Sequence, residues 1–416
     1  MLLGEGEQRA ALRDVLAAFL SSRALVWAAG IAAVLLFGWR PGAIAQLDHA
    51  HLTMPFHQAI GNFLVAPATR WDSAWYLSIA RTGYAFPFQT VFFPLYPGLI
   101  ALGGAFVGHG LDAVVGIVVS CGCAIGALYL LHRLVSLEFD QRLAHNTVWI
   151  FAWLPIALML SAVYSESLFL LLAVGCFYAA RRGRWAQAGL AGGLAAATRN
   201  GGVLLLVPLL ILYLYGPRPD REPDRVAAGP WPRYRPRGDI LWAALVPLGL
   251  LAYMAFLQIE LGYPLGPFTQ QLHWGRHFIP LAGIPLGVWS VGRALVAGIP
   301  GLDPNLTAHV TAGEQLRHVV EFGFLVLALA LLRLCWKRLP LAYTAFAAIS
   351  LAMAVSVPTG NDPLKSLPRF TLVMFPLWIA LALWATERRR VREAIAICAP
   401  LLAIGTFLFV GWSWPP

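Results

Sequence analysis

The sequence predicts an all-α polytopic membrane protein, and three observations carry this prediction. Of the 416 residues, 59% are hydrophobic and only 12% are charged, whereas about 25% of the residues in an average soluble protein are charged. The apolar residues form successive long runs joined by short connections, which is the pattern of helices that cross a bilayer. Lys and Arg gather in alternate connections, as expected for a chain that crosses a membrane repeatedly. We therefore expect a single integral membrane domain over residues 1–416.

A helix needs about 20 apolar residues to span a bilayer, and fewer where it is broken or buried in a bundle. About eleven transmembrane helices are predicted by this criterion, at residues 20–38, 112–131, 145–161, 164–180, 185–198, 201–216, 240–260, 317–334, 340–357, 370–386 and 394–412. They leave a long first outer loop at 39–111, a basic cytoplasmic loop at 217–238 and an outer loop at 262–316. No cleavable signal peptide is expected, because the first apolar run lacks a small-residue cleavage site followed by a soluble sequence.

The positive charges predict the orientation. With a cytoplasmic N-terminus, 21 of the 30 Lys and Arg residues lie on the cytoplasmic side, Arg23 among them, while the acidic residues divide almost evenly. This is the positive-inside pattern. The C-terminus is then on the outer face, which is periplasmic or extracellular in a prokaryote and luminal in a eukaryote, and the composition favours a prokaryotic plasma membrane. The arginines of 217–238 are expected in a solvated loop that faces anionic headgroups, and nucleic acid binding is not expected.

The same topology places several polar motifs together on the outer face. The aromatic density of the first outer loop favours short helices lying in the membrane interface over disorder. Charged residues are costly near a membrane interior, so their recurrence at helix ends on one face predicts a shared polar cavity. The motifs are Arg70-Trp71-Asp72 with Trp75-Tyr76, Tyr164-Ser165-Glu166-Ser167, Arg199-Asn200-Gly201-Gly202 and Lys365-Ser366-Leu367-Pro368-Arg369-Phe370.

Each charged residue also has a purely structural interpretation. Asp72 can cap a short interfacial helix, because Asp is a favoured N-cap residue. Glu166 can be the buried partner of Arg199 and hold two helices together. Arg369 can extend to the interface, as arginines near helix ends commonly do.

Other residue groups indicate structure and not chemistry. Gly189 and Gly193 form a GxxxG pattern, which is expected to serve helix packing. All five cysteines lie in apolar segments without a CxxC pair, so no disulfide framework is expected. Two histidine pairs, His49/His51 and His273/His277, have spacings that permit metal binding. Neither has a convincing acidic or cysteine partner nearby, and no metal site is predicted.

At its outer-face motifs the chain resembles the PIG-V-type mannosyltransferases, which are membrane glycosyltransferases of the GT-C class. The matching motifs keep their order along residues 70–376. They are Arg70-Trp71-Asp72 with Trp75-Tyr76 and Gly83-Tyr84, Phe93-Pro94-Leu95-Tyr96-Pro97, Tyr164-Ser165-Glu166-Ser167-Leu168-Phe169, Arg199-Asn200-Gly201, and Pro368-Arg369-Phe370 with Phe375-Pro376. The resemblance implies a GT-C-type fold and transfer of a sugar, mannose in the eukaryotic members, from a polyprenyl-phosphate donor to a lipid or glycan acceptor, without a further cofactor.

The resemblance also implies roles for individual residues. GT-C enzymes carry an essential acidic residue in the first outer loop, where this chain has Asp72. A carboxylate there can act as general base towards an acceptor hydroxyl, and attack opposite the phosphate inverts the anomeric carbon. Lys365, Arg369 and Arg199 would bind the donor phosphate, so no metal is required. The further substrate-binding candidates are Arg70, Trp71, Trp75, Tyr76, Tyr84, Tyr96, Tyr164, Glu166 and Asn200.

The chain departs from the class in one respect. Many GT-C relatives place two acidic residues close together in the first loop, whereas Asp72 has no acidic neighbour; either Asp48 approaches it in space or the site uses one carboxylate. The sugar, the acceptor and any partner subunit stay open. Two alternative functions also remain: a lipid-linked-sugar flippase or small-solute transporter, which the lack of an internal repeat disfavours, and another GT-C activity such as protein O-mannosylation or arabinosyl transfer.

Overall fold

The computed structural model describes residues 5–39, 48, 51–56, 59–224, 231–296, 311–360 and 362–413. Within these ranges the chain is helical and holds no strand, apart from one isolated antiparallel bridge between Arg276 and Thr359. Five of the described helices are long and apolar enough to cross a membrane: Gly6–Phe37, His109–Glu138, Gly238–Leu261, Ala312–Arg338 and Val391–Val410. The predicted all-α membrane protein is confirmed.

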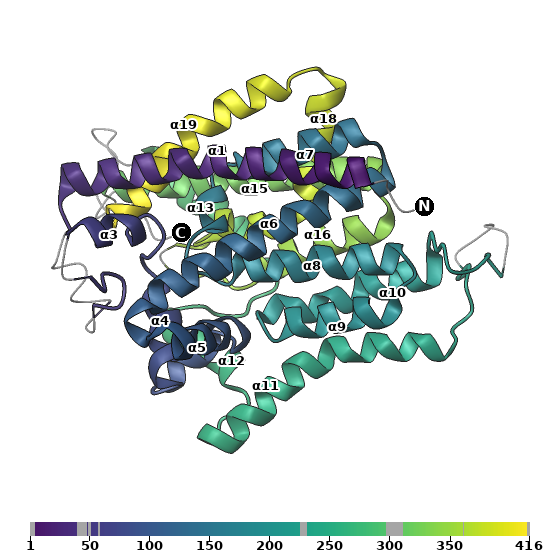
Figure 1. The fold of residues 1–416 in the computed structure, drawn as a ribbon, viewed down its shortest axis with the longest axis horizontal. Coiled ribbons are helices and arrows are strands. Elements are labelled where there is room, and N and C mark those ends of the chain that lie inside the picture. The colour runs from purple at the N-terminus through teal and green to yellow at the C-terminus, as the bar shows by residue number, and fades with distance from the viewer. Residues whose placement is uncertain are drawn as a thin grey trace.

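The first half of the chain forms a row of packed helices. Helix α1 (Glu5–Phe37) lies beside the C-terminal α19 (Val391–Val410) at one edge of the molecule (Figure 1). The row then continues through neighbouring pairs to the opposite edge. In order, α1 packs on α6 (Asp112–Glu138) and α7 (Gln141–Ala152), α6 on α8 (Glu166–Arg181), α8 on α9 (Trp185–Ala196), and α9 on α11 (Leu245–Leu261).

The second half packs around α15 (Ala312–Arg338), which contacts four other helices. These are α13 (Gly283–Val296), α16 (Leu341–Val355), α17 (Leu367–Leu372) and α18 (Phe375–Glu387). Helix α16 also packs on α10 (Leu206–Tyr215) and on the 3-10 helix η4 (Asn200–Leu205). The two halves of the chain are joined through these contacts, which bring α17 towards η4.

Short helices fill the first outer loop, as predicted. They are α3 (Ala59–Val65), α4 (Ser73–Thr82), η1 (Pro87–Val91) and α5 (Leu95–Val107), and they lie at the end of the molecule remote from the N-terminus (Figure 1). The other short elements are η2 (His109–Leu111), η3 (Ala157–Leu160), η5 (Gly238–Ala244), α12 (Gly266–Thr269) and η6 (Gln270–Trp274).

The first helix begins well before the predicted boundary at residue 20. Residues 5–19 are rich in Ala, Leu, Glu and Arg, which are strong helix formers, so they extend the apolar segment as one helix. Arg23, expected on the cytoplasmic side, therefore lies inside α1 and is 6% exposed. Its Nη1 donates to the carbonyl oxygen of Ala157 at 2.6 Å and to Ser161 Oγ at 3.0 Å. The burial of Arg23 was not predicted, because its hydrogen-bond partners are distant along the chain.

The predicted helix at 145–161 is interrupted. Helix α7 ends at Ala152, and Pro155 follows. A proline disfavours helical backbone at the residue before it and cannot donate a helical hydrogen bond. The chain then runs through turns and η3 until Glu166 begins α8. Tyr164 lies near the end of this irregular stretch, and Glu166 is the first residue of α8.

The GxxxG pattern serves helix packing, as predicted. Both glycines of the pattern face the backbone of the segment that leads into α11: Gly189 faces the carbonyl of Trp242, and Gly193 faces that of Leu245. A Cβ atom at Gly193 would lie 2.6 Å from the Leu245 oxygen. Only residues without a side chain allow backbones to approach so closely.

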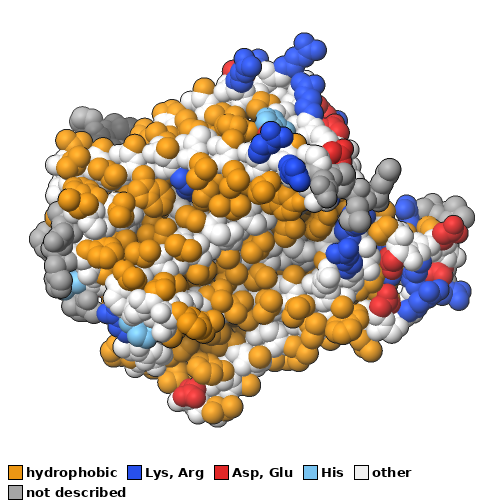
Figure 2. Space-filling view, viewed as in Figure 1, with side chains coloured by type: hydrophobic (Ala, Val, Ile, Leu, Met, Phe, Trp, Pro, Cys, Tyr) orange, Lys and Arg blue, Asp and Glu red, His pale blue; other side chains and the backbone are white. Residues whose placement is uncertain are grey.

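Hydrophobic side chains cover most of the face shown in Figure 2, while Lys and Arg gather at the end near the N-terminus. This surface is that of an integral membrane protein. The basic loop differs in part from the solvated segment that was predicted. The side chain of Arg218 is fully buried, because it stacks over the rings of Trp185 and Tyr213, at 4.5 and 4.3 Å, and pairs with Asp220 and Asp239. Residues 225–230 of that loop lie outside the described part.

Candidate active site

A cavity of about 800 Å³ lies where the start of α4, the start of α8, η4, the end of α16 and α17 converge. Of the lining elements, α4 and α12 lie at the end of the molecule remote from the N-terminus (Figure 1). The wall also includes the segment 267–278 between α11 and α13. Most of the residues predicted for the site line this cavity: Trp71, Asp72, Trp75, Tyr76, Glu166, Arg199, Asn200, Lys365 and Arg369.

Asp72 is the N-cap residue of α4, but its side chain makes no capping hydrogen bond. Instead, Asp72 Oδ2 accepts a hydrogen bond from Arg369 Nη1 at 2.6 Å. The two residues are 297 positions apart. The carboxylate remains 29% exposed. The side chain of Asp72 is therefore directed to the cavity cation and not to the helix end.

The backbone before α4 holds Asp72 in place. Trp71 has a φ of 56°, a left-handed conformation that costs about 1–3 kcal/mol for a bulky residue and persists only where the surroundings impose it. The Asp72 N–H donates to the hydroxyl of Tyr164 at 3.1 Å, and that hydroxyl donates to the carbonyl of Arg70 at 3.1 Å. Trp71 Nε1 donates to the carbonyl of Phe409 at 3.2 Å. Contacts with two distant parts of the chain, at Tyr164 and Phe409, thus stabilise the strained turn.

Glu166 joins two of the cations. It is 1% exposed, and its Oε1 accepts from Arg199 Nη1 at 2.5 Å and lies 3.4 Å from Arg369 Nε. The predicted pairing of Glu166 with Arg199 is confirmed. Arg369 does not extend to an interface, since its side chain is only 11% exposed and lies between Asp72 and Glu166. Burial alone would lower the pKa of Arg369, but Asp72 and Glu166 raise it above its usual value.

Arg276 is a cavity residue that the sequence did not indicate. Its Nη2 donates to the carbonyl of Lys365 at 3.4 Å, and its guanidinium lies 5.3 Å from the centre of the Phe370 ring. Burial and the nearby charge of Arg369 lower the pKa of Arg276 to about 10, against the opposing effect of Asp72. The only sequence signal is an arginine close to a tryptophan, Trp274, in the predicted outer loop at 262–316.

The cavity lining carries an excess of positive charge. Among the described lining residues, the cations are Arg199, Arg276, Lys365 and Arg369, and the carboxylates are Asp72 and Glu166. Four cations face two carboxylates. Such an excess favours an anion with about two negative charges, which a phosphate group carries.

One wall of the cavity is aromatic. The ring of Trp75 lies 5.4 Å from that of Phe88, 6.5 Å from that of Phe92 and 5.8 Å from that of Trp274. Beside it, the Tyr76 hydroxyl is 2.9 Å from Ser165 Oγ. Burial, together with the charge of Glu166, raises the pKa of Tyr76 to about 12, so this phenol stays protonated at neutral pH. The wall combines flat apolar faces with polar groups at its edge.

Four of the predicted substrate-binding residues lie behind the cavity wall. Arg70 is 1% exposed and donates to the carbonyls of Val410 and Thr69, at 3.2 and 2.9 Å. The Tyr84 hydroxyl donates to the carbonyl of Phe92 at 2.7 Å, and the Tyr96 hydroxyl lies 2.7 Å from Ser120 Oγ. Tyr164 binds the backbone of Arg70 and Asp72. None of the four is among the described lining residues.

Asp48 is engaged within its own turn. Its Oδ1 accepts from the Leu52 N–H at 2.7 Å and its Oδ2 from the Thr53 N–H at 2.6 Å. The second carboxylate of the cavity is therefore Glu166. Of the histidine pairs, His273 stacks on Phe88 with ring centres 4.6 Å apart, and His49 lies outside the described residues.

Solved structures with a similar arrangement of helices include the oligosaccharyltransferase AglB of Archaeoglobus fulgidus in complex with an inhibitory peptide and a dolichol-phosphate. The match covers 95% of this chain and 56% of that chain, at 12% identity and a TM-score of 0.44. A second structure of the oligosaccharyltransferase of this organism, tethered with an acceptor peptide, matches over the same shares at 14% identity and a TM-score of 0.44.

Curated proteins with similar sequences are GPI mannosyltransferases. GPI mannosyltransferase 2 of Yarrowia lipolytica is 28% identical over 140 residues, which are 34% of this chain and 39% of that protein. GPI alpha-1,6-mannosyltransferase 2 of Mus musculus is 26% identical over 212 residues, 47% of this chain and 41% of that protein. The chain thus spans about two fifths of the length of these relatives.

The family profile described as "Mannosyltransferase (PIG-V)" matches residues 42–210. This range contains Asp72, Glu166, Arg199 and, from the aromatic wall, Trp75 and Tyr76. The resemblance that the ordered motifs indicated is thereby confirmed: over residues 42–210 the chain matches the PIG-V-type mannosyltransferase family.

Proposed function

We propose that this protein is an inverting, polyprenyl-phosphate-sugar-dependent glycosyltransferase of the GT-C type, which moves mannose to a lipid or glycan acceptor. One observation carries the proposal. A carboxylate, Asp72, shares a cavity with four cations, and the family of residues 42–210 is named for mannosyl transfer. A carboxylate beside several cations suits a reaction in which a hydroxyl is deprotonated while a lipid phosphate leaves.

The phosphate would occupy the positive part of the cavity. Arg199, Arg276, Lys365 and Arg369 can each donate charge-assisted hydrogen bonds to phosphate oxygens, and these bonds strengthen as negative charge develops on the leaving group. Glu166 contacts Arg199 and Arg369, so it holds both guanidinium groups in position before the donor arrives. Preorganised cations stabilise the developing charge without a cofactor.

The ion pair between Arg369 and Asp72 suggests how donor binding prepares the base. While Arg369 Nη1 bonds to Asp72 Oδ2, that oxygen is occupied and is not free to accept a hydrogen bond from an acceptor hydroxyl. A phosphate that draws Arg369 to itself leaves Asp72 free to accept the proton of an acceptor hydroxyl. The hydroxyl oxygen then attacks the anomeric carbon, the bond from that carbon to the phosphate oxygen breaks, and the lipid phosphate leaves. A β-linked donor yields an α-glycoside.

The rest of the cavity suits the lipid and sugar parts of the donor. An apolar wall between η4 and α16 offers a path for a polyprenyl chain, with Val203 and Leu204 on one side and Met353, Ala354 and Val357 on the other. The faces of Trp75 and Trp274 suit the apolar face of a pyranose ring. Tyr76, a protonated phenol, and Asn200 are placed to bond sugar hydroxyls.

The proposed orientation puts the cavity on the outer face of the membrane. The positive end of the molecule, near the N-terminus, would lie in the cytoplasm, in line with the positive-inside rule (Figure 2). The cavity lies at the other end of the helices. Lipid-linked donors reach this face only after their head group has crossed the bilayer.

The first experiment is a transfer assay in nanodiscs. Purified protein is incubated with radiolabelled polyprenyl-phosphate mannose and a total lipid extract, and wild type is compared with Asp72→Asn. We expect label in a new acceptor with wild type and a loss of about 10²–10⁴-fold with Asp72→Asn, the range for removing a general base. Asp14→Asn is the matched control, since Asp14 is exposed on α1 and pairs with His145; it should transfer normally.

The outcomes separate the alternatives. Full activity of a correctly folded Asp72→Asn would remove the assignment of Asp72 as the base. Label that crosses the vesicle membrane without forming a covalent product would support the flippase or transporter function instead. Analysis of the labelled product distinguishes a glycolipid from a mannosylated protein, and a panel of other polyprenyl-phosphate sugars tests arabinosyl transfer.

A further inference from the structure

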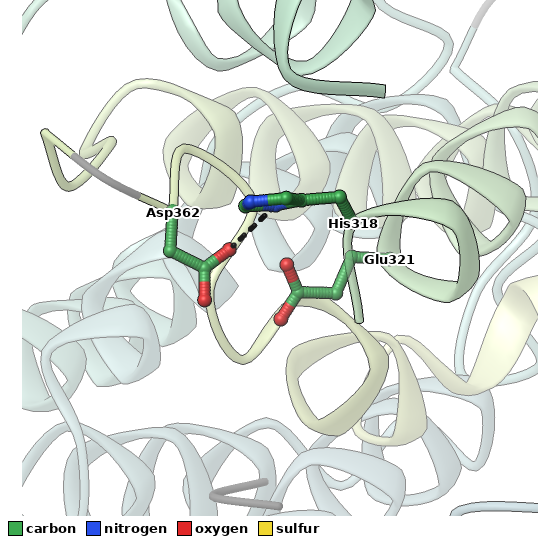
Figure 3. A group of neighbouring side chains, drawn as sticks. All are labelled: His318, Glu321 and Asp362. Atoms are coloured by element: carbon green, nitrogen blue, oxygen red, sulfur yellow. Dashed lines mark ion pairs between the residues drawn. The ribbon is translucent and has the colours of Figure 1, made fainter. Parts of the chain in front are cut away.

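A second cluster of chemically active side chains lies beside the proposed phosphate site. His318 and Glu321 are three residues apart on α15, and Asp362 is in the loop between α16 and α17. All three are at least nine-tenths buried, at 9%, 1% and 5% exposure. Figure 3 shows the imidazole and the two carboxyl groups turned towards one another, and the candidate ligand atoms all lie within 4.8 Å of each other.

The charges in this cluster are incompletely balanced. Arg317 Nε lies 2.9 Å from Asp362 Oδ2, and His318 Nδ1 lies 3.6 Å from Asp362 Oδ1. Beyond these ion pairs, both oxygens of Asp362 and both oxygens of Glu321 have no hydrogen-bond partner within the described chain. An unpartnered buried carboxylate is costly. It is therefore either protonated or compensated by a cation that the polypeptide does not supply.

The donor set suits a metal ion. One imidazole nitrogen and two carboxylates are ligands typical of first-row divalent transition metals, whereas Mg²⁺ and Ca²⁺ prefer oxygen ligands alone. Ligand atoms about 2.0–2.2 Å from a tetrahedral zinc ion lie about 3.3–3.6 Å from one another, so the side chains would need to approach one another by about 1 Å. We propose that His318, Glu321 and Asp362 bind a divalent transition metal such as zinc.

The position of the site suggests what the metal does. Asp362 begins the turn that carries Lys365, since its carbonyl accepts from the Lys365 N–H at 3.0 Å and from Thr359 Oγ1 at 2.6 Å. Arg276 in turn bonds to the Lys365 carbonyl. A metal would therefore clamp this turn to α15. Its effect on the donor phosphate rests on the proposed function, but the binding of the metal does not.

Metal binding is measured directly on tag-free protein in nanodiscs. After incubation with ZnCl₂ or with MnCl₂ and removal of free metal, elemental analysis should find one equivalent per chain. A chelator should lower the Tm, and the same metal should restore it. Glu321→Gln and Asp362→Asn should lose the bound equivalent. Glu314→Gln, the same change in the exposed capping box of α15, should keep it.

The result that overturns the proposal is wild-type protein that retains no metal and has a Tm insensitive to the chelator. A Glu321→Gln variant that keeps the full equivalent would equally remove the ligand assignment. If a variant does not fold, the metal site is still tested by the Tm of the wild-type protein, measured with the chelator and again after the metal is returned. Since metal content and Tm are read without a sugar donor, an absence of transfer activity alone would count against the proposed function and not against the metal site.

Discussion

Arg369 is the residue on which the cavity is organised. Its guanidinium reaches Asp72 through Nη1 and Glu166 through Nε, and it lies 5.4 Å from the centre of the Tyr164 ring. A planar fork can bond two carboxylates at fixed angles, whereas the ammonium of lysine is a single point charge. The geometry of Arg369 is thus as important as its charge.

Replacing Arg369 tests this distinction. Arg369→Ala should lower kcat/KM about 10²–10³-fold, as expected when a donor to a developing anion is lost. Arg369→Lys keeps the charge but loses the second contact, so it should recover only part of that loss. The measurement is steady-state transfer at varied donor concentration. Arg338→Lys is the matched control, because Arg338 forms an exposed pair with Glu387. Wild-type kcat/KM for Arg369→Lys would contradict the proposed dual contact.

Glu166 illustrates how burial couples neighbouring residues. It is nearly inaccessible and holds Arg199 at 2.5 Å. Removing one member of a buried ion pair leaves the other uncompensated, which is strongly destabilising. Loss of activity on substitution of Glu166 would therefore combine a folding effect with a site effect, and Arg369 is the better probe of the chemistry.

At the scale of elements, two local interruptions create the site. Helix α7 ends before Pro155, and the irregular stretch that follows brings Glu166 into the cavity wall and Tyr164 behind it, against the backbone of Asp72. The left-handed turn at Trp71 likewise starts α4 with Asp72 facing Arg369. In unbroken helices these side chains would be spread along the helix axes. The breaks instead direct them into a common space.

The contact between α9 and α11 depends on the absence of side chains. Gly193→Leu should separate these helices, since a Cβ there would lie 2.6 Å from the Leu245 oxygen. Overpacking of this kind typically costs about 1–3 kcal/mol, so the Tm in detergent should fall. Leu190→Ala, on the exposed side of α9, is the control and should leave the Tm nearly unchanged. An unaltered Tm for Gly193→Leu would mean that the helices do not pack this closely.

At the scale of the whole molecule, the asymmetry of charge predicts the orientation in the membrane. Two exposed, uncharged positions report on it: Ala85 in the first outer loop and Gln141 at the start of α7. A membrane-impermeant maleimide added to intact cells should label Ala85→Cys. It should label Gln141→Cys only after lysis.

The wild-type chain controls for the five native cysteines, which all lie within helices. Its labelling gives the background that is subtracted from both variants. The reverse pattern, with Gln141→Cys labelled in intact cells, would place the cavity on the cytoplasmic face and would contradict the proposed orientation.

The membrane class, the regions of the helices and the main charged residues of the cavity could be predicted without a structure. A backbone in lipid must satisfy its own hydrogen bonds within helices, so long apolar runs have one structural outcome. Asp72, Glu166, Arg199 and Arg369 could be predicted because their motifs interrupt those runs, where a charge is costly without a purpose.

The tertiary structure alone decided which side chains meet. Asp72 and Arg369 are 297 residues apart, and Arg276 contributes from a loop with no distinctive motif. The packing of the helices also places Arg70, Tyr84, Tyr96 and Tyr164 behind the cavity wall, and it brings His318, Glu321 and Asp362 together. Local sequence patterns reflect which residues share a helix face. The packing of helices across the chain decides which faces meet, and no short stretch of sequence records that.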